Sequence, residues 1–424
     1  MENLKKKLLE AGVLTETEEL LEKKEVVSGY DTCLFLDEEG DVKLLWILDP
    51  DRVQDFSAYR KFQKEEKALF SISEEICFEA GERRLLAVKT EYAKPFRLWL
   101  SQTRAAFGSV PPEHLWALTV TLLKVVWKME QSGARHPYIS EDTVFQTGFR
   151  KTSFLLGDFF LEEAKEPGTL ETCVQEIGLL LYDMLNGTVS TYEELKDQAR
   201  QETLPDPVYG RRSWKDAVRC MLQFRQDSEQ QGEAGLKHCM EVLALERKEE
   251  ESDWKYGKNL YEKAREAYFQ GDFSTAEELA EQGEQGAELL CKRLTGCIFL
   301  KQGQEEEALD YFEDAAEQGD PVSACYLSRL LFSNARSPVD FKEVERYVRQ
   351  GERAELPMAW YDLGLYYDSG KAGFPCDREK AMEYMKKSAS CSYRKALEYL
   401  SRYSQEQEYW EKRMKEEILL KDPV

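Results

Sequence analysis

Residues 294–320 read LTGCIFLKQGQEEEALDYFEDAAEQGD, and this pattern returns farther along the chain. It returns at Leu327 as LSRLLFSNARSPVDFKEVERYVRQGERAE, at Leu363 as LGLYYDSGKAGFPCDREKAMEYMKKSASCS, and at Leu400 as the shorter LSRYSQEQEYWEKRMKE. A related stretch, AREAYFQGDFSTAEELAEQGEQG, precedes them from Ala264. A period of roughly 35 residues is typical of helix-turn-helix units that stack into a solenoid. The second half of the chain is therefore predicted to be a helical repeat array.

Small residues recur at one position in the second helix of these units: Ala276, Ala308, Ala381 and, in the third unit, Val344. Small side chains let neighbouring helices approach closely, while leucine and aromatic positions fill the layer between units. Gly283, Gly319 and Gly351 follow helical runs, as glycines that end helices in the left-handed conformation do. One such unit cannot bury its apolar face alone, so several units must stack.

The Leu363-Gly364 pair, the small residues Ala359 and Ala381, and the loop that ends before Asp377 resemble Sel1-like repeats. These repeats are relatives of tetratricopeptide repeats, with a longer and more variable loop between the two helices of a unit. The resemblance implies a concave surface that binds other proteins. The predicted partner contacts, on first helices and in a phase opposite to the buried leucines, are Lys292, Arg329 and Tyr361. The alternative is that each of these is simply an exposed side chain.

The first half contains a second informative stretch, residues 136–161, which read HPYISEDTVFQTGFRKTSFLLGDFFL. It resembles the catalytic centre of a protein kinase, where a loop H-R-D-L-x-x-x-N is followed, about a hairpin later, by the metal-binding D-F-G. His136 stands at the loop histidine and Ile139 at its leucine. Pro137 stands at the arginine, Tyr138 at the catalytic aspartate and Thr143 at the metal-binding asparagine.

The D-F-G position reads D-F-F from Asp158, so the aspartate is kept and the glycine is lost. Phosphoryl transfer depends on positioning and charge neutralisation, and here no carboxylate orients the acceptor hydroxyl. Only about fifteen residues separate Asp158 from Cys173, an interval that in active kinases holds an activation loop and an A-P-E anchor. The resemblance therefore implies a catalytically inactive domain, a pseudokinase.

The segments upstream extend the resemblance. Residues 26–48 predict two strands joined by the turn Asp37-Glu38-Glu39-Gly40. The Gly-rich loop and the lysine-bearing strand of a kinase would lie here. Only Gly29 remains of the glycine pattern. The lysine position holds Trp46 or Ile47, and Lys43 lies nearby but out of register.

Three further segments follow the kinase order. Residues 56–70 predict an amphipathic helix in the place of helix C, with Glu65 or Glu66 at its ion-pairing glutamate. Residues 84–92 are similar to the strand that enters the hinge. Residues 173–187 are similar to the long buried helix of the larger lobe, and Cys173 takes the position of the aspartate that braces the catalytic loop. The resemblance implies an α+β, two-lobed protein-kinase-like domain followed by an all-α helical repeat solenoid.

Two other interpretations remain open. A D-F dipeptide after a strand is common, and H-P-Y also suits an ordinary turn, because a residue before proline favours an extended backbone. Alternatively, the domain is an atypical kinase-fold enzyme that binds a nucleotide and metal through Asp158, with Glu141 or Asp142 as a displaced carboxylate. Under the main interpretation the nucleotide site survives only as vestiges at Gly29, Glu65 and Asp158. We then expect no cofactor, no metal site and no nucleotide binding.

Composition sets the outer bounds of the prediction. A chain of 424 residues with 42% hydrophobic residues is long enough for two domains. Residues 1–9 are charged and lack the apolar segment of a secretory signal. The ten cysteines are scattered without C-x-x-C spacing, so neither a zinc cluster nor a disulfide framework is indicated. These features favour a cytoplasmic protein. The net charge of −23 argues against nucleic acid or an anionic membrane as partner.

The predicted division is a helical extension over residues 1–24, the kinase-like domain over 25–247, a linker over 248–256, and the repeats over 257–424. Thr15-Glu16-Thr17-Glu18 is a predicted helix N-cap. The charged run RKEEESD at residues 247–253 either forms the linker or continues as a helix into the first repeat. The predicted function is that of a protein-binding scaffold or adaptor in bacterial signalling or complex assembly.

Overall fold

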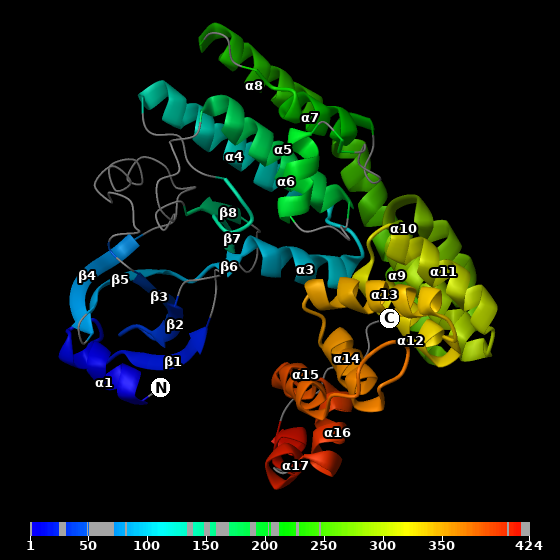
Figure 1. Ribbon diagram of the computed structural model, residues 1–424. Coiled ribbons are helices and arrows are strands. Elements are labelled where there is room, and N and C mark those ends of the chain that lie inside the picture. Colours follow the sequence, from blue (N-terminus) through cyan, green and yellow to red (C-terminus); the bar gives the residue numbers. More distant parts are fainter. Residues whose placement is uncertain are drawn as a thin grey trace.

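The structure is a computed structural model, and it describes most of the chain (Figure 1). The described residues are 2–24, 31–48, 50, 72–80, 83–133, 139–147, 153–157, 169–186, 192–201, 203–204, 212–225, 229–245, 247–404 and 407–416. An antiparallel sheet with attached helices forms the first half, and helices alone form the second half. The predicted sequence of a sheet-containing region and a helical repeat region is thereby confirmed at this level.

The larger sheet has five antiparallel strands in the order β1-β2-β3-β5-β4. The strands are β1 (Glu19–Lys24), β2 (Asp31–Leu36), β3 (Val42–Leu48), β4 (Ile72–Ala80) and β5 (Arg83–Glu91). The predicted hairpin is confirmed, because β2 and β3 pair across a turn that Asp37 closes by accepting hydrogen bonds from the backbone N–H groups of Glu39 and Asp41. Gly40 supplies the left-handed backbone, with φ 84°, that the turn requires.

The side chains of β3 alternate between two cores, as the two-residue period of a strand demands. Leu44, Trp46 and Leu48 face the helices of the first half, whereas Leu45 faces the other side of the sheet. There α1 (Glu2–Glu10) covers the sheet and buries Leu8. Residues 2–24 therefore contribute a helix and an edge strand to the sheet.

The prediction that residues 4–24 form one or two short helices is wrong for the second part of this segment. Residues 19–24 form β1, because pairing with β2 outweighs the helix propensity of ELLEKK. The predicted N-cap does form a local hydrogen bond, since the Thr15 N–H donates to the Glu18 carboxylate at 2.8 Å. The chain after it enters a strand instead of a helix.

Helices and a small sheet complete the first half. They are β6 (Lys94–Pro95), α3 (Phe96–Phe107), α4 (Pro112–Ser132), β7 (Val144–Thr147), β8 (Ser153–Leu156), α5 (Leu170–Asn186), α6 (Tyr192–Arg200), α7 (Arg212–Leu222) and α8 (Glu229–Ala244). The order β6-β7-β8 is antiparallel. Apolar side chains from α3, α4, α5, α7 and α8 form one continuous core with the inner face of the larger sheet. The helix predicted over residues 56–70 lies outside the described residues.

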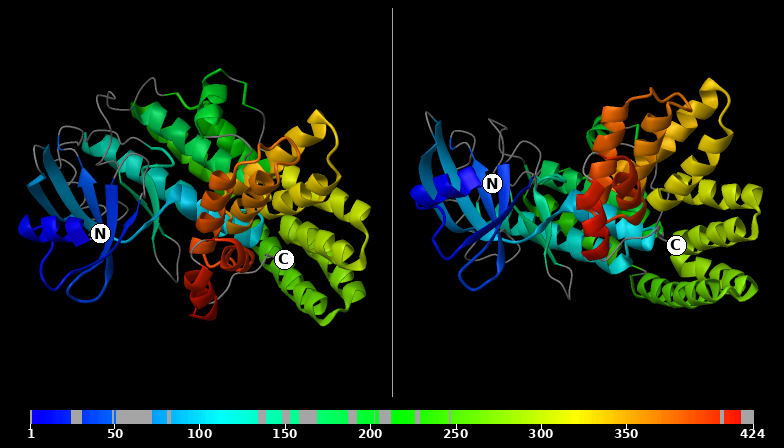
Figure 2. Two further views of the ribbon diagram at one scale, coloured as in Figure 1. Left: turned by 60° about the horizontal axis from the view of Figure 1, so that its bottom comes forward. Right: turned by 90° about the horizontal axis from the view of Figure 1, so that it is seen from below.

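The second half is a run of helix pairs. They are built from α9 (Arg247–Gln270), α10 (Phe273–Gln302), α11 (Glu305–Glu317), α12 (Pro321–Asn334), α13 (Pro338–Arg353), α14 (Pro357–Ser369), α15 (Arg378–Ser390), α16 (Arg394–Tyr403) and α17 (Gln407–Glu416). Helix α10 kinks at Ala287, so its first part pairs with α9 and its second part with α11. Seen from below, the pairs curve around so that α9 and α16 face the same hollow side of the array (Figure 2).

The repeat register read from the sequence matches this packing. The first-helix leucines Leu294, Leu327, Leu363 and Leu400 are at most 2% exposed. The small second-helix residues Ala276, Ala308, Val344 and Ala381 are fully buried. Gly319 has the predicted left-handed backbone, with φ 97°. Gly283 and Gly351 do not end helices but lie inside α10 and α13, where a missing side chain admits close neighbours such as Ala359 beside Gly351.

The two halves meet at helix α3, which lies between the sheet and the array (Figure 1). Phe107 at its end packs edge-on against Trp254 of α9, with ring centroids 6.0 Å apart. Fully buried Arg293 of α10 donates to the Ala105 carbonyl at 3.0 Å and forms an ion pair with buried Asp320, the N-cap of α12. The predicted linker, residues 248–256, lies inside α9. The charged run at residues 247–253 is therefore the start of a helix that continues into the first repeat, and not a separate linker.

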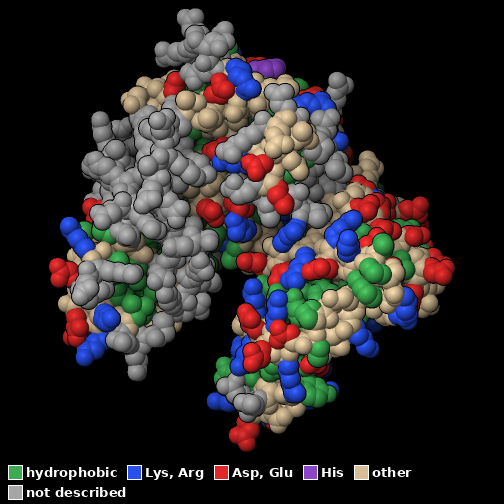
Figure 3. Space-filling view, in the orientation of Figure 1, with side chains coloured by type: hydrophobic (Ala, Val, Ile, Leu, Met, Phe, Trp, Pro, Cys, Tyr) green, Lys and Arg blue, Asp and Glu red, His purple; other side chains and the backbone are tan. Residues whose placement is uncertain are grey.

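The surface of the array is strongly acidic on its outer side. Glu and Asp side chains gather over the region of α10 and α11 in Figure 3, and the first turn of α11 alone carries Glu305, Glu306 and Glu307. Among the helices of the described residues, none is long and apolar enough to cross a membrane.

Candidate functional site

Two regions are candidates for function: the kinase-like loop with its surroundings, and the hollow side of the array. Several residues predicted from the kinase resemblance lie outside the described residues. These include Gly29, Glu65, Glu66, His136, Pro137, Tyr138 and Asp158. The described residues include Thr143, Cys173 and those at the lysine position. Their side chains are buried or make structural contacts.

Thr143, at the position of the metal-binding asparagine, is 1% exposed and closes a tight turn. Its hydroxyl oxygen accepts a hydrogen bond from the Ser140 N–H at 2.9 Å, and its carbonyl accepts one from the Gly157 N–H at 2.7 Å. A buried hydroxyl committed to the backbone in this way is poorly placed to bind a metal. Among the described residues, no group of His, Cys, Asp and Glu side chains could hold a metal ion.

Cys173 stands at the position predicted for the aspartate that braces the loop, and a carboxylate lies close to it in the same helix. Cys173 is buried, 1% exposed, but Glu176 lies nearly one helical turn later in α5. Its carboxylate accepts a hydrogen bond from the Ile139 N–H at 3.1 Å and pairs with Lys196 of α6 at 3.0 Å. A carboxylate of α5, three residues after the position predicted for the brace, therefore contacts the backbone at Ile139.

Trp46, one of the two residues at the lysine position, joins the sheet to the helical part of the first half. It is fully buried, its indole N–H donates to Thr90 at 2.9 Å, and its ring meets Phe145 of β7 edge-on at 5.9 Å. Ile47 points to the opposite core. Lys43 pairs with Glu91 and Asp37. No cation at these three positions faces the core shared with the helices.

Glu141, predicted as a possible displaced carboxylate, forms an ion pair with Arg97 of α3. Burial raises the pKa of Glu141 to about 7, against the opposing effect of Arg97 and with a further increase from Asp183. Asp142 lies 3.6 Å from the same guanidinium and is more exposed. Glu141 is thus a partly buried carboxyl group close to its midpoint at neutral pH.

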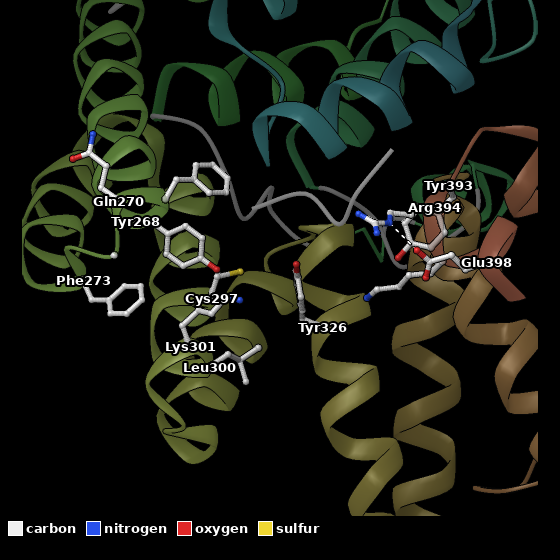
Figure 4. Close-up of a pocket in the computed structure, with 13 residues that line it drawn as sticks. Tyr268, Gln270, Phe273, Cys297, Leu300, Lys301, Tyr326, Tyr393, Arg394 and Glu398 are labelled. Atoms are coloured by element: carbon white, nitrogen blue, oxygen red, sulfur yellow. Dashed lines mark hydrogen bonds and ion pairs between the residues drawn. The ribbon is translucent and has the colours of Figure 1, made fainter. Parts of the chain in front are cut away.

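The second region is a cavity of about 1040 Å³ on the hollow side of the array (Figure 4). Its walls come from the two ends of the array. Tyr268 and Cys297 lie on one side and Tyr393, Arg394 and Glu398 on the other, with Tyr326 between them. We call this cavity the groove. The remaining lining residues are Phe269, Gln270, Gly271, Phe273, Leu300, Lys301 and Lys395.

Aromatic rings and cations dominate the groove. Five of its thirteen lining residues are aromatic, and Phe269 exposes 64% of its surface. The lining carries three cations, Lys301, Arg394 and Lys395, against the single carboxylate of Glu398. This balance is the reverse of the chain as a whole, whose net charge is −23.

The predicted partner contacts do not line the groove, and they are less exposed than predicted. Lys292 pairs with Glu288 and Asp314, and its side chain is 13% exposed. Arg329 forms two 2.8 Å contacts with the Asp362 carboxylate and donates to the Tyr393 hydroxyl at 3.2 Å. Tyr361 packs on Tyr393, with centroids 5.6 Å apart. Arg329 and Tyr361 thus contact Tyr393, which lines the groove. Lys292 instead lies in the contact between α10 and α11.

Most of the groove residues were missed because they do not share one repeat phase. The wall of α9 and α10 comes from the aromatic cluster at residues 268–273, and the opposite wall from the start of α16. The density of aromatic residues in AYFQGDF was the available signal. No model of a known protein family matches the chain, and a search of curated proteins found no significant match.

Proposed function

We propose that the chain is a catalytically inactive kinase-like protein whose helical repeats, of the Sel1-like type, bind a protein partner in the groove. The observation that carries this proposal is the aromatic, cationic groove formed jointly by the two ends of the array. Concave repeat surfaces are stiff and extended, which suits a scaffold or adaptor.

The contacts of the first half support inactivity. Thr143 is used to close a turn, Trp46 fills the space between sheet and helices, and Glu141 is paired with Arg97. The order of elements supports the kinase-like interpretation, because five antiparallel strands precede a long helix, a hairpin and a second buried helix. A domain with this arrangement and without its catalytic groups serves as a structural platform.

The contacts between the two halves support a scaffold in which the halves act as one body. Arg293 ties α10 and α12 to the backbone of α3, and Phe107 inserts between the halves beside Trp254. A partner held in the groove would therefore have a fixed position relative to the kinase-like half.

The test compares affinity capture by the intact chain with capture by two variants. Lys301→Glu reverses a groove cation, and Lys255→Glu makes the same charge change at an exposed lysine of α9 outside the groove. We expect Lys301→Glu to abolish capture of the partner and Lys255→Glu to preserve it, with unchanged circular dichroism in both. Capture that is equal in both variants would place the partner elsewhere and overturn the proposal.

A second candidate function rests on Glu141, whose pKa of about 7 suits a general base. In that case the chain binds a nucleotide and retains slow phosphoryl transfer. A thermal shift with ATP and magnesium discriminates, because a ligand of the native state must raise the melting temperature. Stabilisation at submillimolar ATP, together with transfer that Glu141→Gln removes, would favour the enzyme. We expect neither result.

A further inference from the structure

We infer that the groove recognises an acidic peptide segment that carries an aromatic or large aliphatic anchor. This inference rests on the proposed function and specifies the chemistry of the partner. Three features of the groove point to this class of ligand: its size, its aromatic lining and its charge.

The size of the groove selects a short segment. Its volume of about 1040 Å³ is near the upper end of the range of small-ligand pockets, so it can hold several side chains but not a folded domain. Its walls come from helices at opposite ends of the array, and Tyr326 lies between them (Figure 4). A segment that enters the groove would touch both walls at once.

The aromatic side chains that line the groove select an apolar anchor. Phe269 and the partly exposed Phe273 and Tyr326 leave aromatic surface in contact with water. Covering such surface with an apolar side chain is favourable, and aromatic anchors in pockets carry much of the affinity of peptide interfaces. Leu300, which is half-buried beside them, extends the apolar surface.

The charge of the groove selects carboxylates. Arg394 and Lys395 are both exposed at the start of α16, and Lys301 is exposed at the end of α10 on the opposite wall. Glu398 accepts from Arg394 at 2.7 Å, and the lining as a whole holds three cations and one carboxylate. An acidic segment would be attracted here and repelled by the outer surface of the array, so its encounter is directed to the groove.

The Tyr268 hydroxyl adds a hydrogen-bond donor for a carboxylate. Burial raises the pKa of Tyr268 to about 12, so its hydroxyl stays protonated at neutral pH. In Figure 4 the hydroxyl of Tyr268 points into the groove beside Cys297. A hydrogen bond from such a donor to a charged acceptor is stronger than one between neutral groups.

The experiment measures fluorescence anisotropy of three labelled synthetic peptides with the intact chain. The first, EDEFLDE, combines carboxylates with an anchor. The second, KRKFLKR, keeps the anchor and reverses the charge, and the third, EDEGGDE, keeps the charge and removes the anchor. We expect the first peptide to bind at least about tenfold more tightly than either of the others, since each lost feature removes a separate contribution. Equal or preferred binding of the basic peptide, or no binding by any peptide, would overturn the inference.

Variants of the chain locate the binding. Lys301→Glu should weaken EDEFLDE by about tenfold or more, and the control Lys255→Glu should leave its affinity unchanged. Raising the salt concentration should weaken binding, because salt screens exposed charges. Partner capture that depends on Lys301 without any preference for the acidic anchored peptide would leave the proposed function standing and remove this inference. Concentration-dependent sedimentation that Lys301→Glu abolishes would show a second copy in the groove and also overturn it.

Discussion

The buried ion pair between Arg293 and Asp320 gives the sharpest stability prediction. Replacing Asp320 by alanine removes the carboxylate that Arg293 contacts through Nε at 2.9 Å and through Nη2. It also removes the N-cap of α12, because the same carboxylate accepts from the Ser323 N–H at 2.9 Å. Both side chains are essentially inaccessible to water, at 1% and 0% exposure.

The expected loss follows from these contacts. Burial alone would lower the pKa of Arg293, but the Asp320 carboxylate raises it above its usual value, so the guanidinium stays charged in the folded chain. Leaving such a charge buried without its partner costs about 3–5 kcal/mol. The lost cap adds about 1 kcal/mol. Asp320→Ala should therefore reduce the free energy of unfolding by about 4–6 kcal/mol.

The matched control is Asp272→Ala, which removes the N-cap of α10 without touching an ion pair. Urea unfolding followed by circular dichroism gives the midpoint and slope for each variant. If Asp320→Ala fails to fold, Asp320→Asn keeps an oxygen for the cap and removes only the charge. A loss from Asp320→Ala no larger than that from Asp272→Ala would refute the reasoning, because the buried pair would then contribute nothing.

Three further predictions concern packing and pH. Gly257→Ala should lower the free energy of unfolding by about 3 kcal/mol or more, because a Cβ there would lie 2.5–2.8 Å from backbone atoms of α10. The control is Gly271→Ala, at the turn after α9, where no other atom lies near the added Cβ. This control should cost less in the same urea titration. Ala381→Leu should lower the free energy of unfolding by about 1–3 kcal/mol, because the larger side chain overpacks a fully buried contact. Its melting temperature should fall by more than that of a chain truncated before α17. Glu141 holds its proton to about pH 7 in the folded chain and only to about 4.5 when unfolded, so stability should fall as the pH rises between these values. In the Glu141→Gln variant, the urea midpoints measured at pH 4.5 and at pH 7 should therefore differ less than in the unchanged chain. The same pH dependence in both proteins would contradict the role of this carboxyl group.

Local sequence patterns predicted the elements whose contacts are local. The β2–β3 hairpin follows from an acidic, glycine-ended turn between two apolar runs, and the buried leucines of the array follow from their spacing. The strand β1 was missed because its residues favour a helix, and only pairing with β2 makes it a strand. The charged run at residues 247–253 was ambiguous for the same reason. Its helix is fixed by distant partners, such as Trp214, whose indole donates to Glu250.

The candidate site was less predictable than the fold. The exposure predicted for Lys292 failed because Asp314, on the next helix, pairs with it. Glu176 was missed because motif alignment pointed to Cys173, whereas the carboxylate that contacts the Ile139 N–H lies three residues later. The groove depends on the curvature accumulated over several units, a property that no single repeat carries in its sequence.

Because the walls of the groove come from the two ends of the array, the number of helix pairs between them matters for the evolution of the gene. Solenoids commonly gain or lose units, because each unit contacts only its neighbours. Here α9 and α10 form one wall and α16 the other, so an inserted or deleted helix pair would carry Tyr393 and Arg394 away from Tyr268 and Lys301. Duplication would then preserve folding while destroying the cavity. Copy number in this array is therefore constrained by geometry, and relatives that keep the groove should keep the number of helix pairs between its walls.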